Sequence, residues 1–498
     1  MKTSGYLVLG AFAAVAAITA SQTHSAALGA LRSAVPATVP PPYRLPSDNF
    51  PAGQATVDAY GWQEFIALNW VASSYAGKPD STQTMSTFGM PGDFRPGVWN
   101  SYKDADELFG GQEPGPWQNP TQAKLLTKQG GKKFTLMSKV DKRLVRTIPI
   151  QRRLASGDST QESALQAAGT WLTDQRGNLI WYEVRVNEDE FSYITTNKLY
   201  DSLSQVNFAK TTGIWLPDGR NKPDGKRQYG TTGAIEVKAS WRVIPNGQLA
   251  QYQGRYKIVK GLIPNNVVVT QDKKGNYHNQ LSDFHPAYLG LVGLHIIHKT
   301  PNFSQFTWAT FEHVDLAPTE NQPIDPKKDY LLFNKQCPDQ CGVATPAGCN
   351  ANQSPIPGKD KVTTPVQVVR CANTIPADAA VDGINKQYQQ KIRAANSKSV
   401  FQFYKLVSVQ WPQSPVKYAI QPQLAPLSVG GITPSSLGNL ASETYALRKG
   451  CMSCHQYGNS LATKGLSPNA PSYASDYSFL FGLAKPVLSA KAAAPARR

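Results

Sequence analysis

Two cysteines and a histidine near the carboxyl end of the chain have the spacing of a covalent haem site. The run Cys451-Met452-Ser453-Cys454-His455 is a C-x-x-C-H motif, the attachment pattern of c-type haem. This spacing lets two thiols reach the two haem vinyl groups while the adjacent imidazole turns onto the iron. We therefore expect Cys451 and Cys454 to form thioethers and His455 to be the proximal iron ligand. The motif predicts one covalently attached haem c.

A C-x-x-C pair can also be redox-active or bind zinc, and both alternatives fit this sequence less well. A redox-active pair is expected near a βαβ pattern, which this part of the chain lacks. Structural zinc takes four protein ligands, and two more at matched spacing are missing around the motif. We therefore keep the haem interpretation.

The sixth iron ligand is not part of the motif. No Met follows His455, so this ligand must come from upstream or be absent, which leaves an open or water-bound iron. A lone His among apolar neighbours is more often a satisfied core residue than a ligand. His24 is available only if the amino-terminal segment is retained. The upstream candidates are Met85, Met90, Met137, His278, His285, His295, His298 and His313. We carry forward His298, His295, His313, Met90 and Met85.

The motif resembles that of the c-type cytochromes, and this resemblance covers only the carboxyl-terminal part of the chain. The stretches Thr173 to Ile194 and Leu291 to Asp315 are similar to large exported proteins known only as cytochrome c family members. The resemblance implies a haem protein and supplies no substrate. In small cytochromes the attachment site lies near the start of the haem domain and a downstream Met is the sixth ligand, and this chain departs from that pattern.

The amino-terminal residues predict export to the periplasm. Lys2 precedes an apolar stretch from Tyr6 to Ala20, and small residues follow at positions 25–27, so residues 1–27 have the pattern of a signal peptide. The apolar stretch is shorter than the roughly 20 residues that a spanning helix needs. We therefore expect no integral membrane span after its removal, with an uncleaved anchor as the alternative. Export also agrees with haem c attachment.

The chain is basic, which bears on its partners. It has 51 Lys and Arg against 34 Asp and Glu, a formal net charge of +17. Charge alone is compatible with nucleic acid, anionic lipid or an acidic protein, and export argues against nucleic acid. The block from Lys124 to Arg153 contains a single acid, Asp141. It is either a solvated surface, a docking face for an acidic redox partner, or a face for an anionic membrane.

The other four cysteines predict structure rather than chemistry. They are Cys337, Cys341, Cys349 and Cys371, in a tract rich in Pro, Gly and Asn. Little apolar burial can hold such a tract, and two disulfides, each worth roughly 2 to 4 kcal/mol, would constrain it. Three pairings are open, and a zinc or iron–sulfur site is the alternative.

Hydrophobic periodicity predicts the elements that position these residues. Alternation with period two predicts strands over 232–244 and 400–411, and a turn at 176–178 leads into another over 179–186. An all-apolar run predicts a buried strand over 289–300. Helical spacing predicts helices over 58–72 and 188–199, the second opened by an Asn187–Glu190 capping box. Near the motif, Leu440, Thr444, Leu447 and Cys451 lie on one helical stripe with Asn439 as N-cap, and another helix begins at Ser475.

These elements predict an α+β fold with a β-rich main body and a small helical C-terminal haem-binding segment. The expected organisation is a signal peptide (1–27), a Pro-rich arm (28–57), the body (58–411, with a disulfide-bonded loop region 337–371), a Pro-rich linker (412–434) and the haem segment (435–498). The function expected is that of an exported monohaem cytochrome carrying out one-electron transfer. A haem c enzyme with an open sixth iron position is the alternative, and a ligand-sensing module is a third class.

Overall fold

The computed structural model describes most of the chain between positions 53 and 487. Predictions for the signal peptide, most of the Pro-rich arm and nearly all of the basic block lie outside the described residues, as do His24 and Met137. The described residues are 53–118, 135–136, 171–219, 229–271, 277–343, 346, 348–356, 359–361, 363–374, 380–460 and 472–487.

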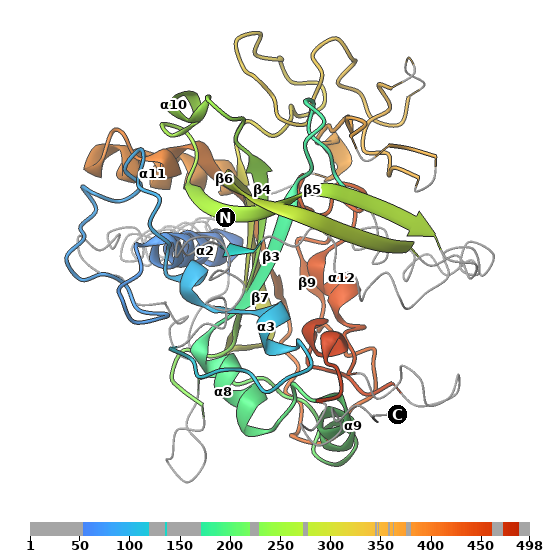
Figure 1. Cartoon of the computed structure of the whole chain (residues 1–498). Helices are drawn as coiled ribbons and strands as arrows, with labels where there is room; N and C mark the ends of the chain where they lie inside the picture. Colours follow the sequence, from blue (N-terminus) through green and yellow to red (C-terminus); the bar gives the residue numbers. More distant parts are fainter. Residues whose placement is uncertain are drawn as a thin grey trace, which may run out of the picture.

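One large sheet is the centre of the fold (Figure 1). Its strand order is β1-β3-β4-β6-β7-β8-β9, and β5 pairs with β6 and with β2. All of these pairings are antiparallel except that of β2 with β5. The strands are β1 (Lys103–Asp104), β2 (Thr135–Leu136), β3 (Trp181–Val186), β4 (Ile235–Val243), β5 (Ile258–Gln271), β6 (Tyr277–Thr300), β7 (Phe303–His313), β8 (Tyr404–Pro412) and β9 (Ile432–Thr433).

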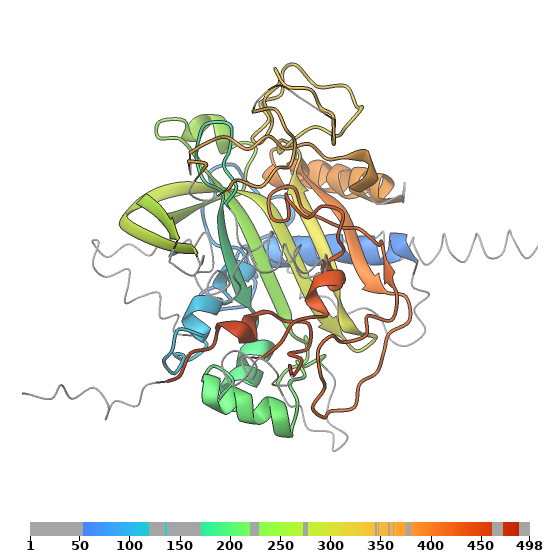
Figure 2. The same ribbon diagram turned by 90° about the vertical axis from the view of Figure 1, so that its right-hand side faces the viewer.

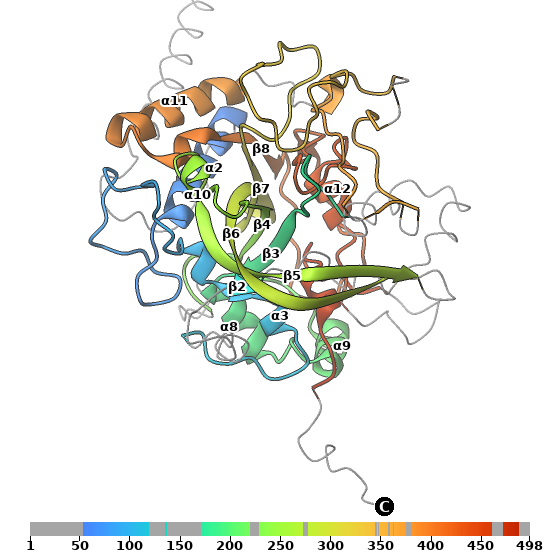
Figure 3. The same ribbon diagram turned by 45° about the horizontal axis from the view of Figure 1, so that its top comes forward.

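The strand predictions are confirmed with local corrections. The run 289–300 is the inner part of β6, which lies between β4 and β7 as its all-apolar character requires. The other half of β6 pairs with β5 in a long hairpin that extends away from the rest of the sheet (Figure 3). The predicted strand over 400–411 begins only at Tyr404, because Val400–Phe403 form a short 3-10 turn.

The helices lie around this sheet, and α+β is the correct class. The prediction over 58–72 corresponds to α2, which begins at Gln54 and ends at Asn69. The Asn187 cap is confirmed, since its side chain accepts a hydrogen bond from the Glu190 amide at 3.2 Å. The described helices are α2 (Gln54–Asn69), α3 (Ala105–Leu108), α8 (Glu188–Thr196), α9 (Ser202–Thr211), α10 (Leu249–Tyr252), α11 (Ala380–Ala395) and α12 (Cys451–His455).

Helix α2 covers one face of the sheet. Its Trp62 and Phe65 rings pack on Phe311 of β7 with centroid distances of 5.1 and 4.3 Å. Trp62 also stacks on Tyr388 of α11 at 5.5 Å. Gly61 allows the close approach, because a Cβ there would lie 2.7 Å from Val409 Cγ2 of β8. We call this side of the sheet the α2 face.

The described residues of 435–460 and 472–487, which we call the tail, cover the opposite face, the tail face. In Figure 1, α2 and α12 lie on opposite sides of the strands, and Figure 2 shows α12 in front of the sheet. The tail is held by hydrogen bonds to the strands, such as Ser442 Oγ with Ser240 Oγ at 2.6 Å. Strand β4 was predicted to be half-buried, and this is wrong, because Glu236, Ser240 and Arg242 on its polar side are all buried.

The tail has less helix than predicted. Residues 439–449 form successive turns in place of a helix ending at Cys451. Asn439 is used to bind the sheet, since its Nδ2 donates to the Phe311 carbonyl at 2.8 Å. The helix expected from Ser475 is only a 3-10 turn, Leu480–Leu483. Asp476 and Tyr477 both have positive φ, which breaks helical geometry there.

Candidate functional site

Helix α12 is the single turn that contains the C-x-x-C-H motif. Positions i, i+3 and i+4 of a helix lie on one face, so Cys451, Cys454 and His455 share one side of this turn. Gly450 precedes it with an extended backbone, and a Cβ there would lie 2.3 Å from Gln410 Nε2 and 2.9 Å from the Ser435 carbonyl oxygen. A glycine is therefore needed for α12 to sit this close to β8.

Gln410 fixes α12 to the sheet. Its side-chain Oε1 accepts a hydrogen bond from the Met452 amide at 2.8 Å, and its Nε2 donates to the Pro434 carbonyl at 2.6 Å. Met452 itself is completely buried. The start of the helix and the chain that leads into it are thus attached to one strand residue.

The two motif thiols are unpaired and partly buried. Burial raises the pKa of Cys451 and of Cys454, and the nearby Glu443 carboxylate adds to both shifts. The Cys451 thiol has one weak contact, 3.7 Å from the Leu437 carbonyl oxygen. Both sulfurs are therefore thiols at neutral pH, and neither is bound in a disulfide.

The His455 imidazole lies between two aromatic rings, with centroid distances of 4.5 Å to Trp308 and 4.8 Å to Phe479. Its Nδ1 is 2.8 Å from the Tyr477 carbonyl oxygen. A carbonyl can only accept, so Nδ1 carries the proton and Nε2 has the free lone pair. Burial lowers the pKa of His455 to about 4, which makes the ring neutral at pH 7. This is the state that a metal-ligating histidine needs.

Two unpaired thiols and an imidazole whose Nε2 is available fit a covalent haem. Cys451 and Cys454 would form the thioethers, and His455, on the same side of α12, would supply an imidazole ligand to the iron. Within the described part of the chain, no hydrogen-bond partner occupies Nε2 of His455. The donor set therefore matches the group that the motif predicts.

A polar cluster lies on the tail face beside α12. Nε2 of His295 is 3.0 Å from Glu443 Oε2, and Nζ of Lys238 is 3.2 Å from Glu443 Oε1. Burial alone would raise the pKa of Glu443, but His295 and Lys238 outweigh it and hold this pKa well below its ordinary value. Nδ1 of His295 contacts Thr310 Oγ1 at 2.9 Å. His295 thus shares the sheet face of the motif, with Nδ1 hydrogen-bonded to Thr310 and Nε2 beside the Glu443 carboxylate.

Two other histidine candidates, His298 and His313, lie on the α2 face. His298 is completely buried, with Nδ1 2.6 Å from Glu64 Oε1 and Nε2 2.8 Å from the Thr232 carbonyl oxygen. His313 stacks on Tyr256 at a centroid distance of 3.9 Å. Burial lowers the pKa of His313 to about 3. Both histidines are buried core residues whose contacts are made within the protein.

The methionine candidates are also away from the motif. Met85 is buried in the aromatic core that includes α2. Met90 is 38% exposed, and its sulfur is 3.3 Å from Asn396 Nδ2, just after α11. Of the candidates carried forward, the structure brings only His295 to the face on which His455 lies.

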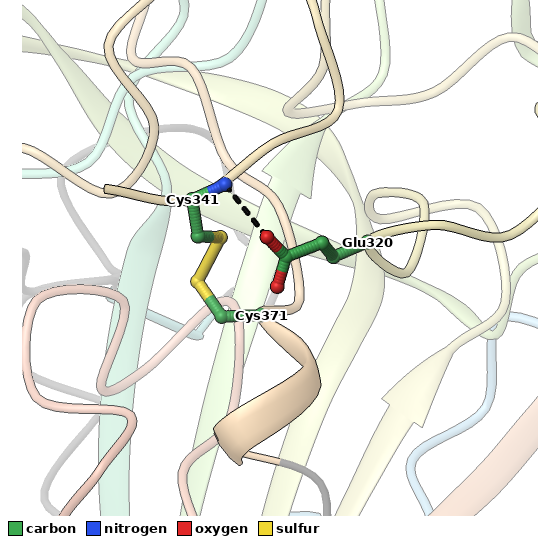
Figure 4. A group of neighbouring side chains, drawn as sticks. All are labelled: Glu320, Cys341 and Cys371. Atoms are coloured by element: carbon green, nitrogen blue, oxygen red, sulfur yellow. Dashed lines mark hydrogen bonds between the residues drawn. A yellow bond between two sulfur atoms is a disulfide. The ribbon is translucent and has the colours of Figure 1, made fainter. Parts of the chain in front are cut away.

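The loop cysteines form two disulfides, Cys337–Cys349 and Cys341–Cys371. The prediction of two disulfides is confirmed, and one of the three open pairings is selected. Figure 4 shows Glu320 beside the second bond, where its Oε1 accepts from the Cys341 amide at 3.0 Å. Both sulfurs near Glu320 are already joined to each other, so this group is explained without a metal.

Sequence analysis did not identify the Tyr477 carbonyl or the Lys299–Asp476 pair as groups that hold the imidazole in place. Tyr477 contributes through its backbone carbonyl, and no side-chain pattern reports such a contact. Asp476 and Lys299, which form an ion pair next to it, are far apart in the chain. The only available signal was proximity to the motif in the tail.

Comparisons with known proteins do not assign the chain to a family. No protein-family model matches the chain, and no match was found among curated proteins or solved structures. In the described ranges, no helix has both the length and the apolar character required to cross a bilayer.

Proposed function

We propose that this protein is an exported c-type cytochrome with one covalent haem and that its function is one-electron transfer. The observation that carries the proposal is the combination found on α12. Two unpaired thiols share one helical face with an imidazole whose Nδ1 is fixed 2.8 Å from a backbone carbonyl. The two disulfides are compatible with an oxidising compartment outside the cytoplasm.

Each residue of the site has a defined task in this proposal. When bound, haem c supplies an iron that exchanges one electron at a potential set by its ligands and surroundings. Cys451 and Cys454 hold the macrocycle, and His455 presents Nε2 to the iron. Trp308 and Phe479 flank the imidazole and fix the orientation of its plane. An acidic redox partner would suit the net charge of +17.

The alternative is a haem c enzyme with an open sixth position, and one observation favours it. Both ring nitrogens of His295 contact other side chains, Thr310 and Glu443. If these contacts persist in the loaded protein, His295 cannot ligate the iron without losing one of them. The sixth position would then be open to a small ligand.

An absorption spectrum of the protein matured in a host that attaches haem c tests the proposal. We expect reduction with dithionite to give a sharp cytochrome spectrum, and acidified acetone to leave the pigment on the protein. Loss of the pigment into acetone would contradict covalent attachment. A spectrum unchanged by carbon monoxide favours electron transfer, and a carbon monoxide complex favours the open-site enzyme.

Two variants locate the attachment. Cys451→Ala with Cys454→Ala should abolish acid-stable haem, because it removes both thioether sulfurs. The matched control is Cys337→Ala with Cys349→Ala, which also removes two sulfurs but leaves α12 intact. Equal loss of pigment in both proteins would contradict the assignment of the motif as the attachment site.

A further inference from the structure

We propose that Lys299 and Asp476 are positioning residues that hold the Tyr477 carbonyl against the proximal imidazole and thereby set the iron potential. The inference rests on the proposed function, because it concerns His455 as an iron ligand. Neither side chain touches His455 in the structure. Both act through the backbone turn at Asp476 and Tyr477.

The turn is attached directly to the end of α12. The Gly458 amide donates to the His455 carbonyl at 2.9 Å, and the Ser475 amide donates to the Gly458 carbonyl at 3.1 Å. A Cβ at Gly458 would lie 2.9 Å from the Tyr477 carbonyl carbon. The Tyr477 carbonyl, which accepts the hydrogen bond from Nδ1 of His455, is therefore packed tightly against the motif.

The backbone of this turn is strained. Asp476 has a φ of 53° and Tyr477 a φ of 68°. Left-handed conformations are unfavourable for residues with a Cβ, and two such residues in succession cost more free energy than one. Such a turn persists only where its surroundings hold it in place.

Asp476 is the main anchor of the turn. It is completely buried, and its Oδ2 accepts from the Leu216 amide at 2.7 Å and forms an ion pair with Lys299 Nζ. Lys299 comes from the end of β6, and its Nζ lies 5.2 Å from the Phe306 ring centroid and 5.7 Å from that of Trp215. The sheet thus holds the turn through one buried cation.

A second anchor is the Tyr477 side chain. Its hydroxyl donates to the Ser428 carbonyl at 2.5 Å, and the ring is completely buried. This anchor carries no charge, so its removal changes the position of the turn without changing the local charge. It is useful for separating the two effects.

Other charges near Asp476 decide how the ion pair responds to substitution. Glu190 and Glu236 are buried carboxyls close to each other, and Asp476 and Lys299 interact with Glu190. Asp218 also acts on Asp476, and burial raises the Asp476 pKa above its ordinary value. If Lys299 is removed, Asp476 can take up a proton, so the net charge of the turn changes little. A large effect of that variant would then come from geometry.

The expected consequence for the iron follows from ligand chemistry. A proximal histidine that donates its Nδ1 proton to a fixed acceptor is a stronger donor to the metal. A stronger donor favours ferric iron and lowers the potential. If the turn relaxes, the carbonyl moves away from Nδ1 and the potential rises.

The test is the midpoint potential of the haem-loaded protein and of Lys299→Met, Asp476→Asn and the double variant. Positioning predicts that the potential rises in all three, and that the double variant shows no cancellation. Charge alone predicts a rise for Asp476→Asn and a fall or no change for Lys299→Met. That second pattern would overturn the proposal.

Two further variants serve as a control and as a replacement if Lys299→Met does not fold. Glu183→Gln breaks another buried pair, Arg185–Glu183 at 2.9 Å on the α2 face, and should lower the melting temperature without moving the potential. If Lys299→Met does not fold, Tyr477→Phe decides, with a smaller rise expected and an unchanged potential as the contrary result. Absence of acid-stable haem in the unmodified chain would refute the proposed function itself. Attached haem with unmoved potentials would refute only this inference.

Discussion

The contacts that hold α2 on the sheet differ in kind from those that hold α12. On the α2 face, the rings of Trp62, Phe65 and Phe311 interlock at centroid distances of 4.3 to 5.4 Å. On the tail face, α12 and the residues before it are held by side-chain hydrogen bonds from strands, such as those of Gln410. The α2 face is a core that stabilises the fold, whereas the tail face fixes the position of a reactive motif.

The difference shows why a strand pattern alone gave the wrong solvent exposure. Alternation along β4 marks one side as apolar and the other as polar, and polar residues are ordinarily taken as solvent-facing. Here the polar side bonds to the tail: Ser240 contacts Ser442, and Lys238 contacts Glu443. Hydrogen bonds depend on direction, so they specify where α12 lies more sharply than apolar contact does.

The largest effect on stability should come from removing a buried ring from the α2 face. Trp62→Ala removes a fully buried ring and its bond to Asn385 Oδ1, and should reduce the free energy of unfolding by about 3 to 5 kcal/mol. Chemical denaturation measures the loss, with Trp62→Phe as the milder control. The Trp62→Ala protein that folds should keep acid-stable haem. Loss of haem from folded protein would contradict the separate roles of the two faces.

A smaller change on the tail face should affect the motif more than the fold. Gly450→Ala places a Cβ against Gln410 and the Ser435 carbonyl, and overpacking of this kind costs about 1 to 3 kcal/mol. We expect a lower fraction of chains with attached haem, measured as pigment per protein. Gly254→Ala, where a Cβ meets nothing within 4 Å, is the matched control. Equal haem content in the two variants would contradict the close-packing account of α12.

One buried group on each face should give stability a pH dependence of opposite sign. His313 on the α2 face has a folded pKa of about 3, below its unfolded value, so its contribution to stability is lost as pH falls below about 6.5. Glu236 on the tail face has a folded pKa of about 7, above its unfolded value, so its contribution is lost as pH rises from about 4.5 through 7.

Each slope can be removed separately. Between pH 6.5 and 4, His313→Phe should weaken the acid loss by on the order of 2 kcal/mol. Glu236→Gln should flatten part of the decline above pH 4.5, because Glu190, whose pKa burial and Glu236 also raise, remains. Urea denaturation across this pH range measures both. Unchanged slopes in both variants would show that other groups control the pH response.

The smallest effect should come from one hydrogen-bonding side chain. Gln410→Ala removes the acceptor of the Met452 amide and the donor to Pro434, and should cost about 1 to 2 kcal/mol. The matched variant is Gln389→Ala on α11, which removes one bond to the Tyr404 carbonyl at 2.8 Å. We expect Gln410→Ala alone to reduce haem attachment. An equal reduction in both would weaken the link between this bond and the motif.

Many strands and helices were predictable from the sequence, whereas the hydrogen bonds that join distant parts of the chain were not. The inner part of β6 (289–300) and helix α2 follow from an apolar run and helical spacing, because burial of those residues decides their structure. The turns at 439–449 replaced a predicted helix because Asn439 and Glu443 bond across to the sheet and to each other. Such contacts join distant parts of the chain, and periodicity carries no information about them.

The candidate site divides in the same way. Cys451, Cys454 and His455 are recognisable because their spacing is local to one helical turn. The Tyr477 carbonyl and the Lys299–Asp476 pair are not, because one is backbone and the other joins β6 to the tail. Sequence therefore indicated the atoms that would bind haem and missed those that orient them.

The mass of the intact chain purified from its native host tests the central claim most directly. We predict the mature chain plus one haem, with the added mass on the peptide that contains Cys451 and Cys454. After alkylation under denaturing conditions, neither sulfur should carry the alkylating group. A chain of unmodified mass, with both sulfurs alkylated, would contradict the assignment of this protein as a cytochrome.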